Sequence, residues 1–145
     1  MLVERLHPMT SSRLVVIGQD ATVQEAALSL SKPGIGLVVV SGAGGGLQGV
    51  VSKSDLIRYL SGTDHATPQI SALMTTSVIT CGPKDDVHDL WQTMATRNLQ
   101  NIPIVDDGAR PLGVLDIRDA MKALFEEETL QERMLFNYVT GVGYR

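Results

Sequence analysis

Several residue types and patterns are scarce in this sequence, and each scarcity excludes a class of protein. Cys81 is the single cysteine among 145 residues, so no intramolecular disulfide can form. Phe, Tyr and Trp make up 4% of the chain, which leaves no stacking platform for single-stranded nucleic acid and predicts an aliphatic core. Apolar runs such as Leu37–Val40 are four residues long, whereas a membrane helix needs about 20.

Positive charge is also scarce, because 12 Lys and Arg face 16 Asp and Glu for a formal net charge of −4. General binding to nucleic acid or to anionic membranes depends on concentrated positive charge, so we expect neither as a partner. The opening residues 1–8 lack the long apolar run of a signal peptide. With 43% hydrophobic and 19% charged residues, the chain is expected to be a globular, cytoplasmic protein.

The sequence contains an internal repeat, which becomes visible when the chain is shifted by 64 or 65 residues. The matched segments are Gly49-Val50 with Gly113-Val114, Asp55 with Asp119, Met9-Thr10 with Met74-Thr75, and 37–40 with 102–105. The copies therefore differ by single-residue insertions, which loops tolerate.

Each copy has the same predicted order of elements, βαββα. In the first copy, an apolar strand at 14–17 precedes the capping box Thr22–Glu25, which starts a helix that Pro33-Gly34 ends. A buried strand at 37–40 leads through a glycine-rich hairpin loop at 42–46 to a strand at 47–51 and a helix after Ser52. The glycine loop lacks the Gly-Lys-Ser/Thr ending of a phosphate loop and leads into a strand.

The second copy is predicted to contain strands at 78–81, 102–105 and 112–115, a helix from Val87, and a long helix from about Ile117. A unit of this size is marginal alone, so we expect an α/β (α+β) fold in which two repeats pack around a pseudo-twofold axis with a cleft between them. The expected boundaries are 8–62 for the first repeat, 63–72 for a linker, 73–126 for the second repeat, and 127–145 for a C-terminal helix and tail.

These features together resemble a tandem pair of cystathionine-β-synthase (CBS) domains, a Bateman module. The resemblance is carried by the two glycine-led segments at 49–56 and 113–120, by Ile102–Asp106, and by the two Met-Thr openings. It implies an adenosine-containing ligand (AMP, ADP, ATP, NAD or S-adenosylmethionine) bound between the repeats, a homodimer, and regulation of a client protein. It implies neither catalysis nor a catalytic cofactor.

The helix start at Ser52–Asp55 is the first candidate ligand site. A carboxylate can accept hydrogen bonds from both hydroxyls of a ribose, while hydroxyls and free amides at a helix N-terminus suit a phosphate. Asp55 would then hold the ribose, Ser52 and Ser54 the phosphate, and Lys53 would add positive charge. Ser-x-x-Asp is also a capping arrangement that stabilises a helix without any ligand, and both interpretations remain open.

The second candidate site is built around Asp119, where Asp116 replaces the Ser or Thr that is usual in the family. Arg118 could offset Asp116 and reach a phosphate, or be a solvated arginine, and Asp116 itself is most simply an N-cap. The basic pair that often precedes the apolar-Pro strand is replaced by uncharged Gln100-Asn101, so a ligand with little phosphate charge fits at least as well as ATP. The adenine walls are expected to come from Ile17, Gly36, Leu37, Cys81, Ile102 and Pro103.

Three further expectations concern the rest of the chain. The scattered His7, His65 and His88 lack metal-ligand spacing, and Cys81 in an apolar strand is read as a buried filler rather than a nucleophile. The aromatic-rich tail at 133–145 is expected to pack on this chain or on a second copy, with a client protein as the alternative. A ligand-free structural or dimerising module that acts through this tail is therefore the alternative to a ligand sensor.

Overall fold

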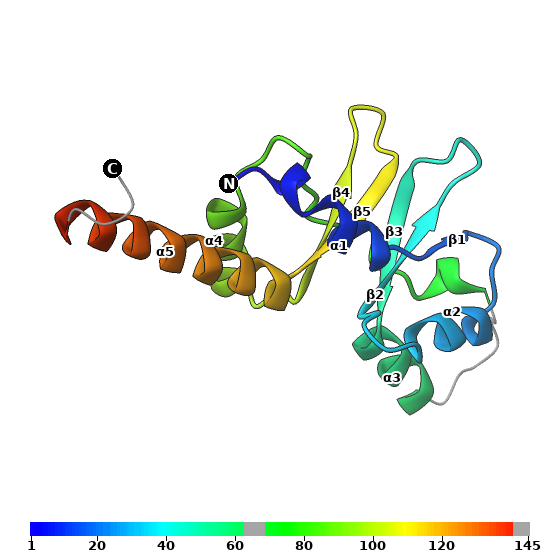
Figure 1. The fold of residues 1–145 in the computed structure, drawn as a ribbon. Helices are drawn as coiled ribbons and strands as arrows, with labels where there is room; N and C mark the ends of the chain where they lie inside the picture. Colours follow the sequence, from blue (N-terminus) through cyan, green and yellow to red (C-terminus); the bar gives the residue numbers. More distant parts are fainter. Residues whose placement is uncertain (63–68, 141–145) are drawn as a thin grey trace.

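The computed structural model describes residues 1–62 and 69–140 and shows two small α/β units side by side with one long projecting helix (Figure 1). The elements are η1 Val3–Leu6, α1 His7–Ser12, β1 Val16–Gly18, α2 Val23–Leu30, β2 Leu37–Ser41, β3 Leu47–Ser52, α3 Lys53–Ser61, η2 Ile70–Ala72, α4 Val87–Arg97, β4 Asn101–Val105, β5 Pro111–Asp116 and α5 Ile117–Thr140. Their order confirms the repeated architecture.

The first repeat contains a three-stranded sheet in the order β1-β2-β3. Val39 in the central strand lies opposite Val16 in the parallel pair and opposite Val50 in the antiparallel pair. The Thr22 hydroxyl accepts the Glu25 amide and caps α2 as predicted. The predicted first strand is shifted, because Val16–Gly18 pairs whereas Leu14 lies outside the strand.

The second repeat contains a two-stranded sheet of β4 and β5. The predicted strand at 78–81 is wrong: only Cys81 pairs, through one parallel bridge to Ile104. Val78 and Ile79 instead line the cleft between the repeats. On the other side the chain turns at Gly82, whose amide donates to the Asp85 carboxylate at 2.7 Å. The predicted strand is therefore reduced to the single bridge between Cys81 and Ile104.

The core is aliphatic, as the low aromatic content predicts. One cluster of buried side chains lies in each repeat, and a third joins the two sheets through Leu37, Val39, Val50 and Val114. This shared cluster holds the repeats against each other and sets the position of the cleft at their boundary.

The segment preceding each repeat packs on the other repeat. Val3 is buried in the core of the second repeat, and Ile70, which follows the undescribed residues 63–68, is buried in the core of the first. The two Met-Thr segments continue this crossing. Thr75 exchanges backbone hydrogen bonds of 2.8 and 2.9 Å with Val50, and Thr10 packs against Gly113.

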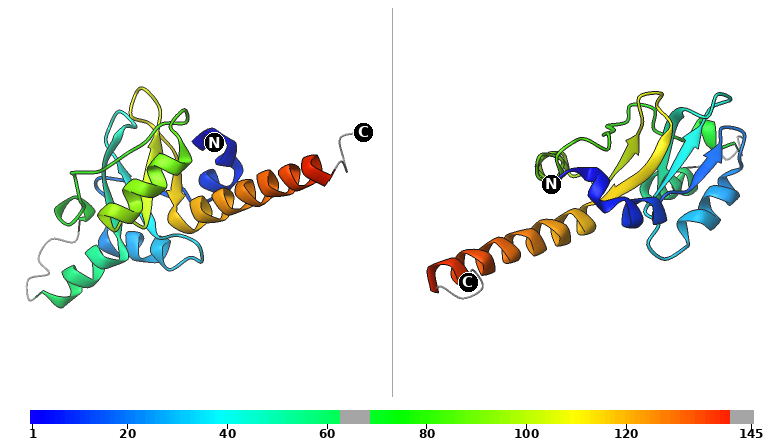
Figure 2. Two further views of the ribbon diagram at one scale, coloured as in Figure 1. Left: turned by 90° about the vertical axis from the view of Figure 1, so that its left-hand side faces the viewer. Right: turned by 45° about the horizontal axis from the view of Figure 1, so that its top comes forward.

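Helix α5 extends well beyond the second repeat (Figure 2). Its first turns bury Ala120 and Ala123, and the long helix predicted from Ile117 is confirmed. Large side chains farther along are exposed: Leu130, Met134, Leu135, Phe136, Tyr138 and Val139. For the tail residues among them, packing on this chain's own core is therefore wrong, whereas packing on a second copy stays a prediction; 141–145 lie outside the described residues. Among the described helices, none combines the length and apolar character needed to cross a membrane.

Candidate functional site

The two repeats enclose a cleft of about 600 Å³ at their boundary. Both repeats line it. The lining residues are Gly36, Leu37, Val50, Ser52, Lys53, Ser54, Asp55, Thr75, Ser77, Val78, Ile79, Asn98, Leu99, Gln100, Asn101, Pro103, Asp116 and Arg118. We call this space the open cleft.

The Ser52–Asp55 segment lies at the start of α3 and contributes four lining residues to the open cleft. It forms a complete capping box. Asp55 Oδ2 accepts the Ser52 amide at 2.9 Å, and the Ser52 hydroxyl accepts the Asp55 amide at 3.3 Å. The capping interpretation is therefore confirmed, and the same carboxylate lines a cleft.

The second carboxylate oxygen of Asp55 accepts a weaker hydrogen bond than the first. Asp55 Oδ1 accepts a hydrogen bond of 3.3 Å from Arg58, whose side chain is 77% exposed. An exposed pair of this kind contributes little to stability. One carboxylate oxygen thus secures the helix start, while the other can accept a hydrogen bond from a ligand if the Arg58 side chain moves into solvent.

Asp116 also lines the open cleft, from the end of β5 in the second repeat, and is 3% exposed. Its Oδ1 accepts the Arg118 amide at 2.8 Å, as an N-cap does, and both oxygens accept from the Arg118 guanidinium. Burial by itself raises the pKa of Asp116, but the hydrogen bonds and charge of Arg118, with the charge of Arg13, outweigh it and lower the pKa below its ordinary value. Arg118 offsets Asp116, as the sequence allowed.

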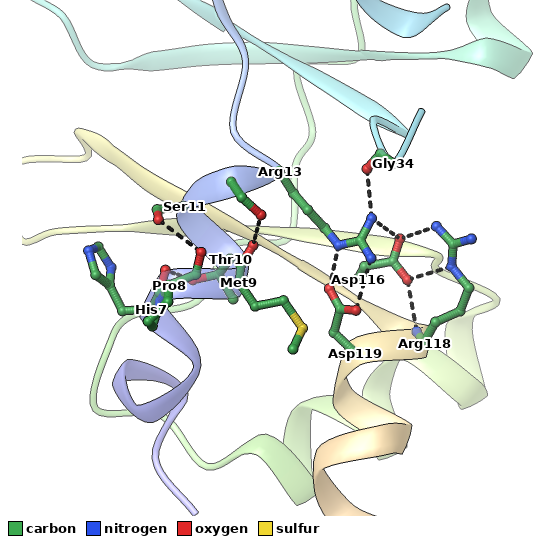
Figure 3. Close-up of polar contacts among 11 residues, drawn as sticks. His7, Pro8, Met9, Thr10, Ser11, Arg13, Gly34, Asp116, Arg118 and Asp119 are labelled. Carbon is green, nitrogen blue, oxygen red and sulfur yellow. Dashed lines mark hydrogen bonds and ion pairs between the residues drawn. The ribbon is translucent and has the colours of Figure 1, made fainter. Parts of the chain in front are cut away.

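Asp119 does not line the open cleft and is instead held by an arginine from the other repeat (Figure 3). Arg13 donates to both carboxylate oxygens, through Nε to Oδ2 and through Nη2 to Oδ1 at 2.9 Å. Its Nη1 donates to the Gly34 carbonyl at 2.7 Å and lies 3.8 Å from Asp116 Oδ2. The hydrogen bond with Asp119 raises the pKa of Arg13.

The residues proposed as adenine walls separate into two groups. Gly36, Leu37 and Pro103 line the open cleft, whereas Ile17, Cys81 and Ile102 do not. Cys81 is buried, and burial, aided by the negative charge of Asp85, raises the pKa of its thiol to about 12. The thiol therefore remains protonated, in keeping with the structural role predicted for it.

Sequence reasoning missed part of the lining, chiefly Thr75, the segment 77–79 and Asn98. Asn98 has a left-handed backbone with φ of 55° at the end of α4, and Gly34, 64 residues earlier, has φ of 82°. In the sequence, Asn98 stands 64 residues after the helix-ending Gly34, and this match between the copies was the available signal. Gln100 and Asn101 do line the cleft, so its edge lacks the positive charge that a basic pair would bring.

Asp86, His88 and Asp89 at the start of α4 place one potential metal-ligand atom each within 4.8 Å of one another. Asp86 already accepts the Asp89 amide and pairs with the N-terminal amine at 3.1 Å. His88 is exposed. These contacts account for the carboxylate without a metal.

The repeated fold, the paired Gly-Val segments and the cleft agree with comparisons against known proteins. The CBS-domain sequence profile matches residues 3–62 and 70–126. The chain belongs to the CBS-domain family. The match covers both repeats and all of the residues that line the open cleft.

Relatives of this CBS pair include an enzyme and ligand-bound structures. Arabinose 5-phosphate isomerase GutQ from Shigella flexneri is 32% identical over 107 residues, which are 74% of this chain and 33% of the isomerase; the chain thus spans about a third of that enzyme. PAE2072 from Pyrobaculum aerophilum, solved with AMP, is 25% identical with a TM-score of 0.72, over 82% of this chain and 89% of that one. The CBS pair of MJ0100, solved with 5′-methylthioadenosine and S-adenosyl-L-methionine, is 25% identical with a TM-score of 0.72, over 86% and 99%.

Proposed function

We propose that this CBS pair is a regulatory module that binds an adenosine-containing ligand in the open cleft. The observation that carries the proposal is a cleft of about 600 Å³ with Asp55 on one wall and Leu37 and Pro103 on its apolar part. Sites for small molecules commonly measure about 300–1,000 Å³ and combine apolar walls with a few polar groups. The ligands of PAE2072 and MJ0100 support an adenosine class.

Each part of such a ligand has a chemically suitable partner in the proposed site. Asp55 would accept hydrogen bonds from the ribose hydroxyls, and Leu37 and Pro103 would flank the adenine. Ser54 and Lys53, at the exposed start of α3, would receive the group attached to the ribose 5′ carbon. The helix N-terminus adds a partial positive charge there.

The charges that line the open cleft favour a ligand with one phosphate or none. Two carboxylates, Asp55 and Asp116, face two cations, Lys53 and Arg118. Arg118 is already paired with Asp116, which leaves Lys53 to balance a phosphate. We therefore propose AMP or S-adenosylmethionine ahead of ADP, ATP and NAD.

Regulation would follow from the two-sided lining of the cleft. A ligand can shift an equilibrium between two arrangements of the repeats only by binding one of them more tightly. Because both repeats contribute walls, their separation changes the number of contacts available to the ligand. Binding would thereby stabilise the arrangement in which both walls meet it.

A thermal-unfolding panel with AMP, ADP, ATP, NAD and S-adenosylmethionine tests this proposal. A ligand at about 100 times its Kd stabilises the folded state by about 2.7 kcal/mol, which raises Tm by several degrees in a chain of this size. We expect AMP or S-adenosylmethionine to give this shift, and Asp55→Ala to abolish it. Each variant is compared with its own ligand-free Tm, because Asp55→Ala also removes half of a capping box.

Asp20→Ala is the matched control, since Asp20 is an exposed carboxylate in a turn outside the cleft. It should retain the full ligand-induced shift. Absence of a shift with all five compounds would refute the ligand proposal. A shift that persists in Asp55→Ala would refute the assigned ribose site.

A dimerising function is the second candidate, and exposed apolar side chains support it. Ile57 on α3 and Met121 on α5, 64 residues apart, are 63% and 52% exposed. Exposed apolar side chains at positions related by the internal repeat are suited to a twofold contact with a second copy of the chain. We propose a homodimer through these helices, with the exposed part of α5 as the surface for a client protein.

A further inference from the structure

The two copies of the repeat differ at the pair of positions occupied by Arg13 and Ser77. These residues are 64 apart, the same separation as Asp55 and Asp119, Ser52 and Asp116, and Gly34 and Asn98. In the open cleft the members of this set are Ser77, Asp55, Ser52 and Asn98, and all four line the cleft. The corresponding set in the other half is Arg13, Asp119, Asp116 and Gly34, of which Asp116 also lines the open cleft.

In that second set, Arg13 contacts the other three residues (Figure 3). Its guanidinium donates to both oxygens of Asp119 and to the Gly34 carbonyl, and lies 3.8 Å from Asp116. The Arg13 side chain is only 19% exposed and Asp119 is 7% exposed. The space that a ligand would need between these groups is therefore occupied by a side chain of the protein.

We infer that this chain has one adenosine site rather than two, because Arg13 closes the second cleft as an internal substitute for a ligand. A planar guanidinium that donates a bidentate pair of hydrogen bonds satisfies both oxygens of a carboxylate. A ribose diol would have to compete for the same two oxygens of Asp119. Asp55 differs, because its Oδ1 receives only the longer bond from exposed Arg58.

The inference rests on the proposed function, since it assumes that the repeats bind adenosine ligands. It assigns Arg13 the role of setting the number of ligand molecules bound per chain. The test is isothermal titration calorimetry with AMP and with S-adenosylmethionine on the full chain. Wild type is expected to bind one equivalent of ligand, that is, one ligand molecule per chain. Arg13→Ser, which copies the residue present at Ser77, is expected to bind two.

Asp→Ala variants assign each equivalent to a cleft. In the Arg13→Ser background, Asp119→Ala should remove the new equivalent and Asp55→Ala the original one. Wild type that binds two equivalents, or folded Arg13→Ser that gains none, would overturn the inference. If wild type binds none but Arg13→Ser binds one that Asp119→Ala removes, the open-cleft proposal fails while the closure by Arg13 stands.

Ser77→Arg tests the same idea without disturbing the ion pair, in case Arg13→Ser does not fold. Ser77 is exposed and lines the open cleft with Asp55, and the repeat relates this pair to Arg13 and Asp119, so we expect an arginine there to pair with Asp55. We expect Ser77→Arg to lose the wild-type equivalent, and Ser77→Ala to keep it. Unchanged binding in Ser77→Arg would contradict closure of a cleft by an arginine at this position.

Discussion

Replacing Gly49 by alanine tests how the two repeats are held together. A Cβ at this position would lie 2.7 Å from the Thr75 carbonyl oxygen and 2.9 Å from the Met74 sulfur. Methionine can move, but the Thr75 carbonyl accepts the Val50 amide at 2.9 Å, and the Thr75 amide donates back at 2.8 Å. The backbone of one repeat would therefore have to separate from the other.

The expected cost follows from two opposing effects. Overpacking of this kind costs about 1–3 kcal/mol, while an alanine reduces the entropy of the unfolded chain and returns about 0.4–1 kcal/mol. Taking the middle of each range, the free energy of unfolding should fall by about 1.3 kcal/mol, which for this chain length is about 5 °C in Tm. Differential scanning calorimetry on ligand-free protein measures it directly.

Gly44→Ala is the matched control, because a Cβ at Gly44 in the hairpin loop meets nothing within 4 Å and its φ is not positive. Its Tm should stay within about 2 °C of wild type, since exposed positions usually change stability by less than about 0.5 kcal/mol. A Gly49→Ala protein as stable as Gly44→Ala would refute the reasoning about the crossed packing. Thr75 also lines the open cleft, so Gly49→Ala should weaken ligand binding as well.

Two further predictions concern charge and assembly. The lowered pKa of Asp116 means that folding stabilises its ionised form. This stability is present above the unfolded-state pKa of about 3.9 and is lost as pH falls through the lower folded pKa. Urea unfolding should show a steeper loss of stability below about pH 4 for wild type than for Asp116→Asn, and equal slopes would contradict the assignment. Ile57→Glu should shift the mass measured by light scattering from dimer to monomer without lowering the monomer's helical content, whereas an unchanged mass would remove α3 from the proposed interface.

The architecture was largely predictable because the sequence contains two copies of the same unit. Capping residues, glycines and apolar strands recur with a fixed separation, so each weak local signal supports its counterpart. The first strand was predicted two residues too early, and at the strand predicted at 78–81 only Cys81 pairs. Apolar residues are equally compatible with a strand and with a cleft wall, and only the packing of the other repeat decides between them.

The candidate site was predictable in part, and the limits have a physical cause. The capping box at Ser52–Asp55 and the offset of Asp116 by Arg118 depend on neighbouring residues, so spacing reveals them. The pairing of Arg13 with Asp119 joins residues 106 apart in sequence, and it depends on how the repeats pack. Comparing the copies position by position places an arginine opposite Ser77, which is the one available signal.

The crossed segments have a consequence for how such a chain could have arisen. Val3 completes the core of the second repeat, and Ile70 completes the core of the first, so neither repeat contains its whole core within its own boundaries. A single unduplicated copy could bury the same surfaces only by exchanging this segment with a second molecule, as in domain swapping. Duplication within one chain would then have joined two exchanging partners, so that the unit of sequence and the unit of folding no longer coincide.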